Sequence, residues 1–271
     1  MRYREMRPSP TAAGFVDRYW ILELDAAEAG AEQKVVPDGT AELILNFAHP
    51  FESFSDGKWR KQPATFLAGQ ITGPLRLRST GAAKMLGVRF LPHGAGKALG
   101  VRMTELRDIF LPVSDLSTTL ARQLDDALNL ERVEAALMAW SRRAGREDTL
   151  VDAAVGQVER GATTEEIAAQ AGISRRQVER RFLDLVGLTP KHFQRMRRFQ
   201  RVFQAIECGA KGWADAAVSC GYYDQAHLIR DCKEFSGDTP SVLLGGDELA
   251  RHFLRREDVS HFSNTKTAAP R

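Results

Sequence analysis

Long apolar runs are missing from this sequence of 271 residues. No stretch approaches the roughly 18–20 consecutive apolar residues that a membrane-spanning helix needs, so we expect no transmembrane segment. The charged N-terminus, MRYREMRPSP, is followed by no apolar stretch, which predicts the absence of a signal peptide. Cysteine is also scarce: an odd count of three argues against a secreted disulfide framework and favours a reducing cytoplasm.

A strong overall charge is missing too, because the formal net charge is only +3. The local distribution is more informative. Between positions 175 and 201 nine basic residues stand against two acidic ones, Glu179 and Asp184; the basic residues are Arg175, Arg176, Arg180, Arg181, Lys191, Arg195, Arg197, Arg198 and Arg201. A local excess of this kind in a nearly neutral protein points to a polyanionic partner.

The order of sequence patterns predicts an α+β protein with two domains. Short runs of aromatic and β-branched residues, separated by Gly and Pro, predict strands of a small sandwich or barrel; they lie at 14–24, 33–47, 64–80 and 82–92. A four-residue spacing of leucines then predicts amphipathic helices within 114–144; these leucines are Leu116, Leu120, Leu124 and Leu128. We expect domains at 1–145 and 149–250, and a polar, disordered tail at 251–271.

The segment TEEIAAQAGISRRQVERRFL, which begins at Thr164, predicts two short helices with a turn between them. Thr164 is expected to cap the first helix, Gly172 to form the turn, and Ser174 to cap the second helix. The spacing of apolar residues on the second helix predicts an inward face of Val178, Phe182 and Leu185. This is the helix-turn-helix arrangement, in which the N-terminal half of the second helix is presented to the major groove.

The outward face of that second helix follows by subtraction. It carries Arg176, Glu179, Arg180 and Leu183, with Arg175 and Arg181 to the sides. A solvated helix face is the alternative for such a charge run, and Glu179 is alternatively an intrahelical partner of the neighbouring arginines.

The same pattern occurs again about fifty residues downstream, in KGWADAAVSCGYYDQAHLIRDCKEF. Here Gly221 is expected at the turn, Asp224 at the cap, and Leu228 with Cys232 on the inward face. Between the two copies, a helix that begins at Pro190 and runs for about eighteen residues spans roughly 27 Å. With the bundles it joins, this helix can place two reading helices about one DNA turn apart, roughly 34 Å.

Two helix-turn-helix units joined by a long helix, with GLTP (187–190) and SGDTP (236–240) after them, resemble the DNA-binding domain of AraC/XylS-type transcriptional regulators. The resemblance covers about residues 149 to 247. It implies DNA base contacts from Arg176, Glu179, Arg180, Gln225, Ala226, His227 and Arg230. We expect phosphate contacts from Arg175, Arg181, Lys191, Arg195, Arg197 and Arg198.

Side-chain chemistry suggests what these positions read. Arg176 or Arg180 can bind guanine in a bidentate manner, Glu179 can accept from cytosine, and Gln225 can pair with adenine. Cys232 departs from the family, which usually has Phe there, and its smaller side chain predicts a looser second unit.

The N-terminal 145 residues resemble the β-rich N-terminal domains of one branch of these regulators, which implies a small cupin-like barrel. By implication this domain senses a small molecule or mediates dimerisation, and RNA polymerase is a further implied partner. The leucine stripe from Leu116 to Leu128 is then either a homodimer seam within 116–140 or a face that packs on the barrel.

No other motif carries a function. HGAGKALG (93–100) lacks the spacing of phosphate-binding loops and predicts a turn into a short helix. Cys208, Cys220 and Cys232 lack the close pairs of zinc sites, and His49 and His93 stand alone, so we predict no metal, cofactor or catalytic residue. A sensor protein whose helical domain mainly binds protein is the alternative function.

Overall fold

The computed structural model describes residues 1–127, 129–207, 210, 212–240 and 242. The predictions for Leu128, for Cys208 and for the tail at 251–271 lie outside the described residues. Ten strands occupy the first 112 residues: β1 (Arg2–Met6), β2 (Val16–Leu24), β3 (Glu32–Val35), β4 (Glu42–Asn46), β5 (Phe51–Ser55), β6 (Lys58–Lys61), β7 (Thr65–Ala68), β8 (Leu75–Ser79), β9 (Ala83–Phe90) and β10 (Phe110–Pro112).

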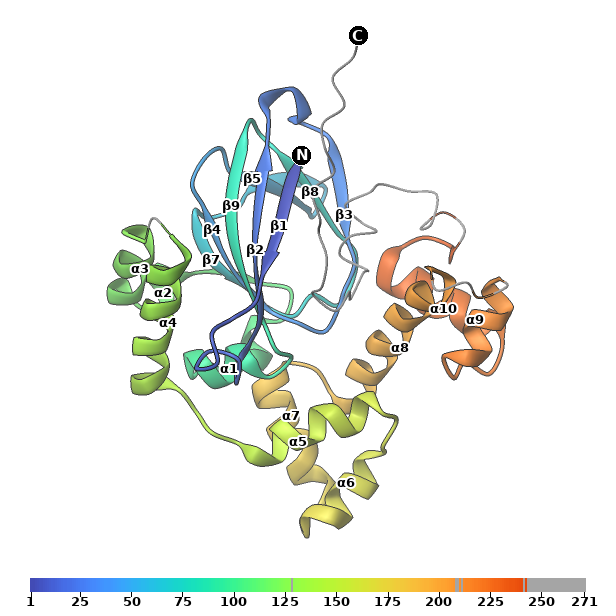
Figure 1. Cartoon of the computed structure of the whole chain (residues 1–271). Coiled ribbons are helices and arrows are strands. Elements are labelled where there is room, and N and C mark those ends of the chain that lie inside the picture. Colours follow the sequence, from blue (N-terminus) through green and yellow to red (C-terminus); the bar gives the residue numbers. More distant parts are fainter. Residues whose placement is uncertain (128, 208–209, 211, 241, 243–271) are drawn as a thin grey trace.

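Helices dominate the rest of the described chain (Figure 1). They are α1 (Gly94–Leu99), α2 (Val113–Leu116), α3 (Thr118–Asp125), α4 (Leu130–Ala144), α5 (Thr149–Glu159), α6 (Thr164–Ala171), α7 (Arg175–Val186), α8 (Pro190–Glu207), α9 (Trp213–Ser219) and α10 (Gln225–Ser236). Short 3-10 helices stand at Ala26–Glu28 and Met103–Leu106. The predicted division into a β-rich N-terminal half and a helical C-terminal half is confirmed.

The strands are hydrogen-bonded as two antiparallel sheets. The larger sheet has the order β1-β2-β9-β4-β7-β10 and the smaller one the order β3-β8-β5-β6. The predicted strand segment 33–47 contains both β3 and β4, which do not pair with each other, because β3 belongs to the small sheet and β4 to the large one. The turn between them passes from one sheet to the other.

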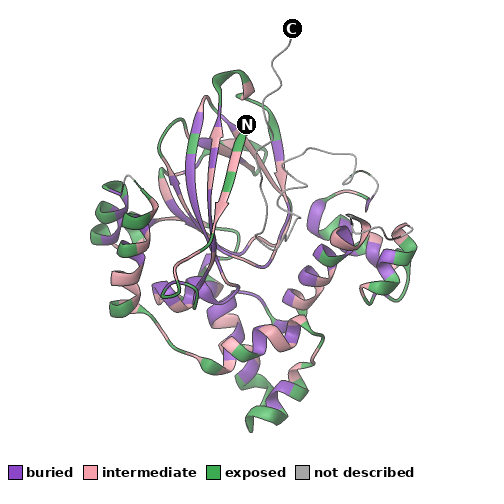
Figure 2. Ribbon diagram, in the orientation of Figure 1, coloured by how far each residue is buried: buried purple, intermediate pink, exposed green. Residues whose placement is uncertain are grey.

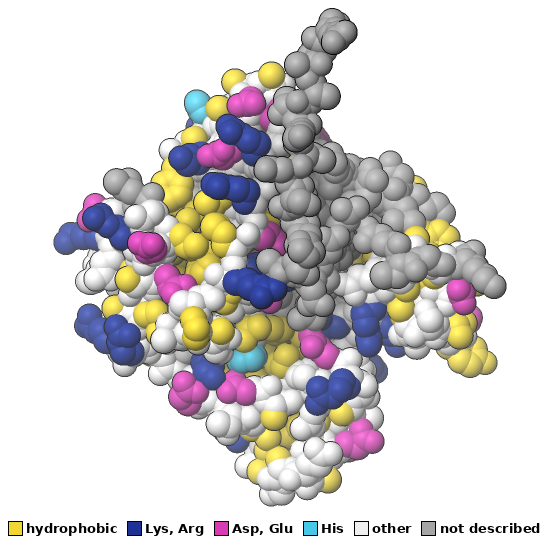
Figure 3. Space-filling view, in the orientation of Figure 1, with side chains coloured by type: hydrophobic (Ala, Val, Ile, Leu, Met, Phe, Trp, Pro, Cys, Tyr) yellow, Lys and Arg dark blue, Asp and Glu magenta, His cyan; other side chains and the backbone are white. Residues whose placement is uncertain are grey.

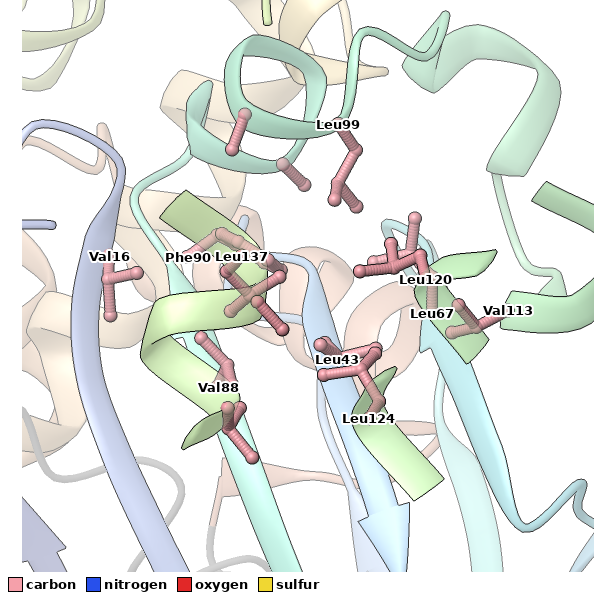
Figure 4. Packing of buried hydrophobic residues seen from close by; sticks show 14 of the residues in the cluster. Val16, Leu43, Leu67, Val88, Phe90, Leu99, Val113, Leu120, Leu124 and Leu137 are labelled. Carbon is pink, nitrogen blue, oxygen red and sulfur yellow. The ribbon is translucent and has the colours of Figure 1, made fainter. Parts of the chain in front are cut away.

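Helices α1 to α4 cover one face of the larger sheet. Leu120 and Leu124 of α3 are buried in one cluster with Leu43 and Leu67 of the sheet (Figure 4). The described part of the leucine stripe thus packs on its own chain, as the second of the two interpretations predicts. As a homodimer seam the stripe is a wrong interpretation for these two leucines, because their side chains are already removed from water.

The helical half has its own core, and α8 runs through it. Phe193, Met196, Phe199 and Val202 on one face of α8 are fully buried, as the spacing predicts, and the helix has the predicted 18 residues. They pack with the inward faces of α5, α6, α7, α9 and α10. In Figure 1, α5 to α7 lie near one end of α8, and α9 and α10 lie near the other.

The two halves are in direct contact. The backbone of α1 lies so close to α7 that a Cβ at Gly96 would stand 2.6 Å from the carbonyl oxygen of Leu185. Arg102 Nε lies 3.6 Å from Asp184 Oδ1, and Lys97 Nζ lies 2.8 Å from Asp152 Oδ2. The first helix-turn-helix unit is therefore packed against the β-rich half.

Candidate nucleic-acid interface

Local side-chain chemistry positions the first helix-turn-helix unit. Thr163, one residue earlier than predicted, caps α6 in a reciprocal capping box with Glu166. Gly172 has φ +64°, the left-handed conformation that ends a helix, and Ser174 caps α7 by accepting from the backbone N–H of Gln177. The predicted turn and second cap are confirmed.

Helix α7 turns its apolar side inward and its arginines outward. Val178, Phe182 and Leu185 are buried as predicted. Arg176 and Arg180 are exposed, and neither forms an ion pair within the described part of the chain. Figure 2 shows the exposed residues of α6 and α7 at the end of the molecule remote from the sheets. These two guanidiniums are therefore available to an outside partner.

Arg175 and Glu179 are less free. Arg175 donates to Glu179 Oε1 at 2.8 Å and to Glu165 Oε1 at 2.7 Å, so Glu179 has the intrahelical partner that the alternative interpretation foresees. Both ion pairs are solvent-exposed, and pairs of this kind contribute little to stability and exchange readily for another partner. Base contact by Glu179 stays a prediction.

The second unit has the same plan. Gly221 has φ +82° at the turn, and Asp224 caps α10 by accepting from the backbone N–H of His227 at 2.7 Å. Leu228 and Cys232 are buried, as the spacing predicts. The outward positions are Gln225, Ala226 and Arg230, all exposed.

His227 differs from the other predicted base contacts of α10. Its ring is half-buried, lies edge-on to Tyr222 at 5.0 Å between centroids, and has Nε2 3.2 Å from Arg198 Nη2. These contacts hold the His227 ring against Tyr222 and Arg198. A contact between His227 and a DNA base therefore requires the ring to leave them.

Arg195 and Arg198, which were predicted to contact phosphates, instead donate hydrogen bonds to a buried carboxylate of the protein. Buried Asp231, 1% exposed, accepts from Arg195 at 2.7 Å, Arg198 at 3.4 Å and the Tyr222 hydroxyl at 3.0 Å. The guanidinium of Arg195 also pairs with Glu234. Arg195 and Arg198 thus spend part of their hydrogen-bonding capacity on α10.

The structure contradicts the predicted phosphate contact of Arg197. Its side chain is buried, pairs with Glu159 at 2.9 Å, and donates to the backbone carbonyl of Asp38 in the β-rich half, also at 2.9 Å. A guanidinium held in this way cannot reach a phosphate. Arg181 pairs with Asp148 but is partly exposed, and Lys191 is exposed.

Two exposed apolar residues near α9 and α10 were not predicted. Tyr223, next to the cap Asp224, is 91% exposed, and Val218 on α9 is 67% exposed. A tyrosine directly before a helix cap was the available sequence signal. Figure 3 shows acidic and basic side chains side by side over the helical half, so the face in view is not uniformly charged there.

Comparison with known proteins agrees with this geometry. Residues 167–245 match a family described as a helix-turn-helix domain, and residues 4–112 match one described as a domain of unknown function (DUF6597). Over 134 residues the chain is 28% identical to the HTH-type transcriptional regulator ArgR of Pseudomonas aeruginosa. That match covers 46% of this chain and 41% of ArgR, so the chain spans less than half the length of this relative.

Two solved structures are also similar. ToxT from Vibrio cholerae has a TM-score of 0.45 and 8% identity, over 90% of this chain and 98% of ToxT. The AraC-like transcriptional activator CuxR has a TM-score of 0.27 and 14% identity, over 75% of this chain and 87% of CuxR.

The C-terminal half of the chain is therefore a DNA-binding domain with two helix-turn-helix units. The predicted resemblance to the DNA-binding domain of AraC/XylS-type regulators is confirmed. Among the described residues, no helix combines the length and apolar character needed to cross a membrane, and no three His, Cys, Asp or Glu side chains are grouped to hold a metal ion.

Proposed function

We propose that this chain is a sequence-specific transcriptional regulator that inserts α7 and α10 into successive major grooves of one DNA site. One observation carries the proposal: two capped helices with exposed polar N-terminal halves stand at the two ends of a single 18-residue helix. A helix of that length spans about 27 Å, which with its flanking units suits neighbouring grooves about 34 Å apart.

The proposed DNA contacts keep the predicted set with the exception of Arg197. Base contacts come from Arg176, Glu179, Arg180, Gln225, Ala226, His227 and Arg230. Phosphate contacts come from Arg175, Arg181, Lys191, Arg195 and Arg198. The exposure of Arg176, Arg180 and Arg230 supports their role most directly.

The regulator acts, in this proposal, in the cytoplasm and without catalysis, with domains at 1–145 and 149–250. Contacts with RNA polymerase and a homodimer are further predictions of the AraC/XylS resemblance. The burial of Leu120 and Leu124 leaves only the outer faces of α3 and α4 for a dimer contact within 116–140.

Small-molecule control of DNA binding is supported by a pocket of about 90 Å³ between the two sheets, which we call the intersheet pocket. This is more space than a single buried water requires. Its apolar walls include Leu22, Ile44, Phe51, Leu77, Met85 and Phe110, and its polar lining includes Trp20, Asp38, Thr40, Glu42 and Arg89.

The turn at Pro37–Thr40 connects this pocket with α8. On the pocket side, the Asp38 carboxylate pairs with Arg89. On the other side, Arg197 donates to the carbonyl of Asp38 at 2.9 Å, and Gln200 donates to the carbonyl of Pro37 at 3.2 Å. Gly39 (φ +78°) lies against the ring of Phe193, where a Cβ would stand 2.7 Å from Cε2. A ligand that displaces this turn would act directly on the helix that joins the two units.

The test is selection of bound sites from a random duplex library by the full chain, followed by salt titration on a recovered site and on a scrambled duplex. We expect enriched sites with two half-sites about one helical turn apart, and affinity that falls steeply between about 50 and 200 mM salt. No enrichment together with a flat salt response would contradict the proposal and favour the alternative of a protein-binding helical domain.

A further inference from the structure

Two glutamine side chains face the intersheet pocket from the small sheet. Gln33 lies on β3, Gln62 directly follows β6, and both line the pocket. Gln33 is the register partner of Leu77 on β8, and the backbone N–H of Gln62 donates to the carbonyl of Phe51 on β5 at 2.8 Å. Leu77 and Phe51 are pocket walls, and residues opposite each other in neighbouring strands point to the same face of a sheet. Because β8 and β5 lie between β3 and β6, the two amides flank an apolar strip on the inner face of the small sheet.

Both amides are buried without a hydrogen-bond partner. Gln33 is 9% exposed and Gln62 is 7% exposed, and neither side chain forms a hydrogen bond within the described part of the chain. The other two buried glutamines, Gln70 and Gln200, donate to backbone carbonyls of the turn at Pro37–Thr40. Buried amides in folded proteins are nearly always hydrogen-bonded to protein, water or a ligand. The free hydrogen-bonding capacity at the pocket wall thus belongs to uncharged groups that both donate and accept.

The charged side chains of the pocket wall are occupied with one another. Asp38 pairs with Arg89, whose Nε donates to Thr40 Oγ1 at 3.2 Å. Glu42 Oε1 lies 3.5 Å from the same Nε, and the Trp20 side chain is a further hydrogen-bond partner of this carboxylate. A charge on a ligand would therefore meet no free counter-charge among these residues, and its removal from water would be costly. This arrangement favours an uncharged ligand.

We propose that the intersheet pocket binds a small uncharged molecule with an apolar body and a carboxamide-like group, to which the amides of Gln33 and Gln62 supply hydrogen bonds. The apolar strip between the two glutamines contacts the body, and a pocket of about 90 Å³ suits a body of only a few carbon atoms. This inference rests on the proposed regulatory role of the pocket and names its ligand class. Because β3 leads into the turn at Pro37–Thr40, a ligand bound to Gln33 acts on the segment that contacts α8.

The test compares three probes of the same branched shape with different polar groups: isobutyramide, methyl isopropyl ketone and isobutyrate. The amide donates and accepts, the ketone only accepts, and isobutyrate carries a charge. Each probe is titrated into the full chain at pH 7.5, and the NMR shifts of the methyl groups of Leu77 and Met85, which line the pocket, report binding at this site. We expect isobutyramide to bind about fivefold more tightly than the ketone and about tenfold more tightly than isobutyrate.

Variants of the two glutamines locate the hydrogen bonds. Gln33→Met combined with Gln62→Met keeps the length of both side chains and removes both amides, so the preference for isobutyramide over the ketone should fall to about onefold. The matched control is Gln123→Met, because Gln123 is exposed on α3 and does not line the pocket. This control should keep the preference of the wild-type chain.

Equal binding of isobutyramide and the ketone, tighter binding of isobutyrate, or unchanged methyl shifts with every probe would overturn the ligand class. A folded double variant that keeps the preference would overturn it as well. The comparison of probes on the wild-type chain decides this even if the double variant fails to fold. DNA binding measured separately on a selected duplex distinguishes the two proposals: intact DNA binding with no amide preference rejects only the ligand class. Lost DNA binding with an amide preference rejects only the regulator.

Discussion

The two helix-turn-helix units share one plan but differ in what lies beneath their recognition helices. Under α7 the core is aromatic: Phe182 lies edge-on to Phe193 at 5.6 Å between centroids, and the helix also packs against α1. Under α10 the corresponding inward position is Cys232; buried Leu228 and Phe235 pack beside it, and a polar network around Asp231 adds further contacts. Apolar packing holds both units, and the second unit adds a buried polar network to it.

The difference extends to the β-rich half. The first unit has apolar and ionic contacts with it, through Gly96 against Leu185 and Arg102 near Asp184. The second unit meets the β-rich half where Lys34 pairs with Asp238 and Pro74 lies near Gly237. We infer that a change in the β-rich half moves the second unit relative to the first, and that the second unit is the more easily loosened.

Removal of the aromatic core should produce the largest effect. Phe182→Ala is expected to destabilise the first unit by about 3–5 kcal/mol, because the buried ring leaves a cavity. Cys232→Ala should cost the second unit only about 1 kcal/mol, since little volume is lost. Hydrogen exchange of the amides in α7 and α10 measures each unit separately. Equal losses would mean that the two cores do not differ as described.

The polar network gives the next effect. Asp231→Ala leaves the partly buried guanidiniums of Arg195 and Arg198 without their shared carboxylate, and should cost about 3 kcal/mol. The control is Glu234→Ala, which removes a more exposed partner of Arg195 and should cost less than about 1 kcal/mol. Protection of the α10 amides is the readout. A loss at Asp231 no greater than at Glu234 would show that charge does not hold this unit.

DNA-binding measurements compare the exposed residues of α7 with those of α10. Arg180→Ala and Arg230→Ala should each cost about 1–3 kcal/mol on a selected duplex and relax discrimination at one base pair. Lys191→Ala should weaken binding to every sequence equally and reduce the salt slope by about one. Binding isotherms on the selected and singly substituted duplexes measure all three. Unchanged affinity in Arg230→Ala would mean that the second unit reads no base.

The smallest effect is a pH dependence of stability. Burial lowers the pKa of His93, whose Nε2 lies 3.1 Å from Asp152 Oδ1, and of His192 on α8. The folded chain then binds fewer protons than the unfolded chain, so stability is present above about pH 6.5 and is lost as pH falls. The slope is at most about 1.4 kcal/mol per pH unit for each histidine.

Urea unfolding at pH 7.5, 6.5 and 5.5 checks this expectation. His93→Gln should remove the part of the slope that arises where α5 meets the β-rich half, and His192→Gln the part from α8. A stability that rises toward pH 5.5 would reverse the predicted sign.

The sequence predicts what depends on neighbours along the chain. Ser174 and Asp224 each cap an N–H three residues ahead, so their roles follow from spacing, whereas Thr163 and Thr164 compete for one cap and only the structure decides between them. The burial of Arg197 cannot be predicted from neighbouring residues, since its acceptor, the Asp38 carbonyl, lies 159 residues away in the sequence.

The pairing of buried charges within the sheet could not be predicted from neighbouring residues either. Glu42 and Arg89 are single charges within apolar runs, AELIL and GVRFL, and that isolation was the available signal. Their opposition requires the register of β4 and β9, which local sequence does not specify.

The contact around α8 has a consequence for how the protein can be divided. Val36 of the β-rich half is 2% exposed and belongs to the hydrophobic cluster of the helical half, and Gly39 covers Phe193. A fragment that starts at Thr149 would present these apolar surfaces to water. Exchange of the DNA-binding half between regulators therefore needs an N-terminal half with a matching surface, or polar substitutions around Phe193. The turn at Pro37–Thr40 thus prevents the two halves from being independent modules.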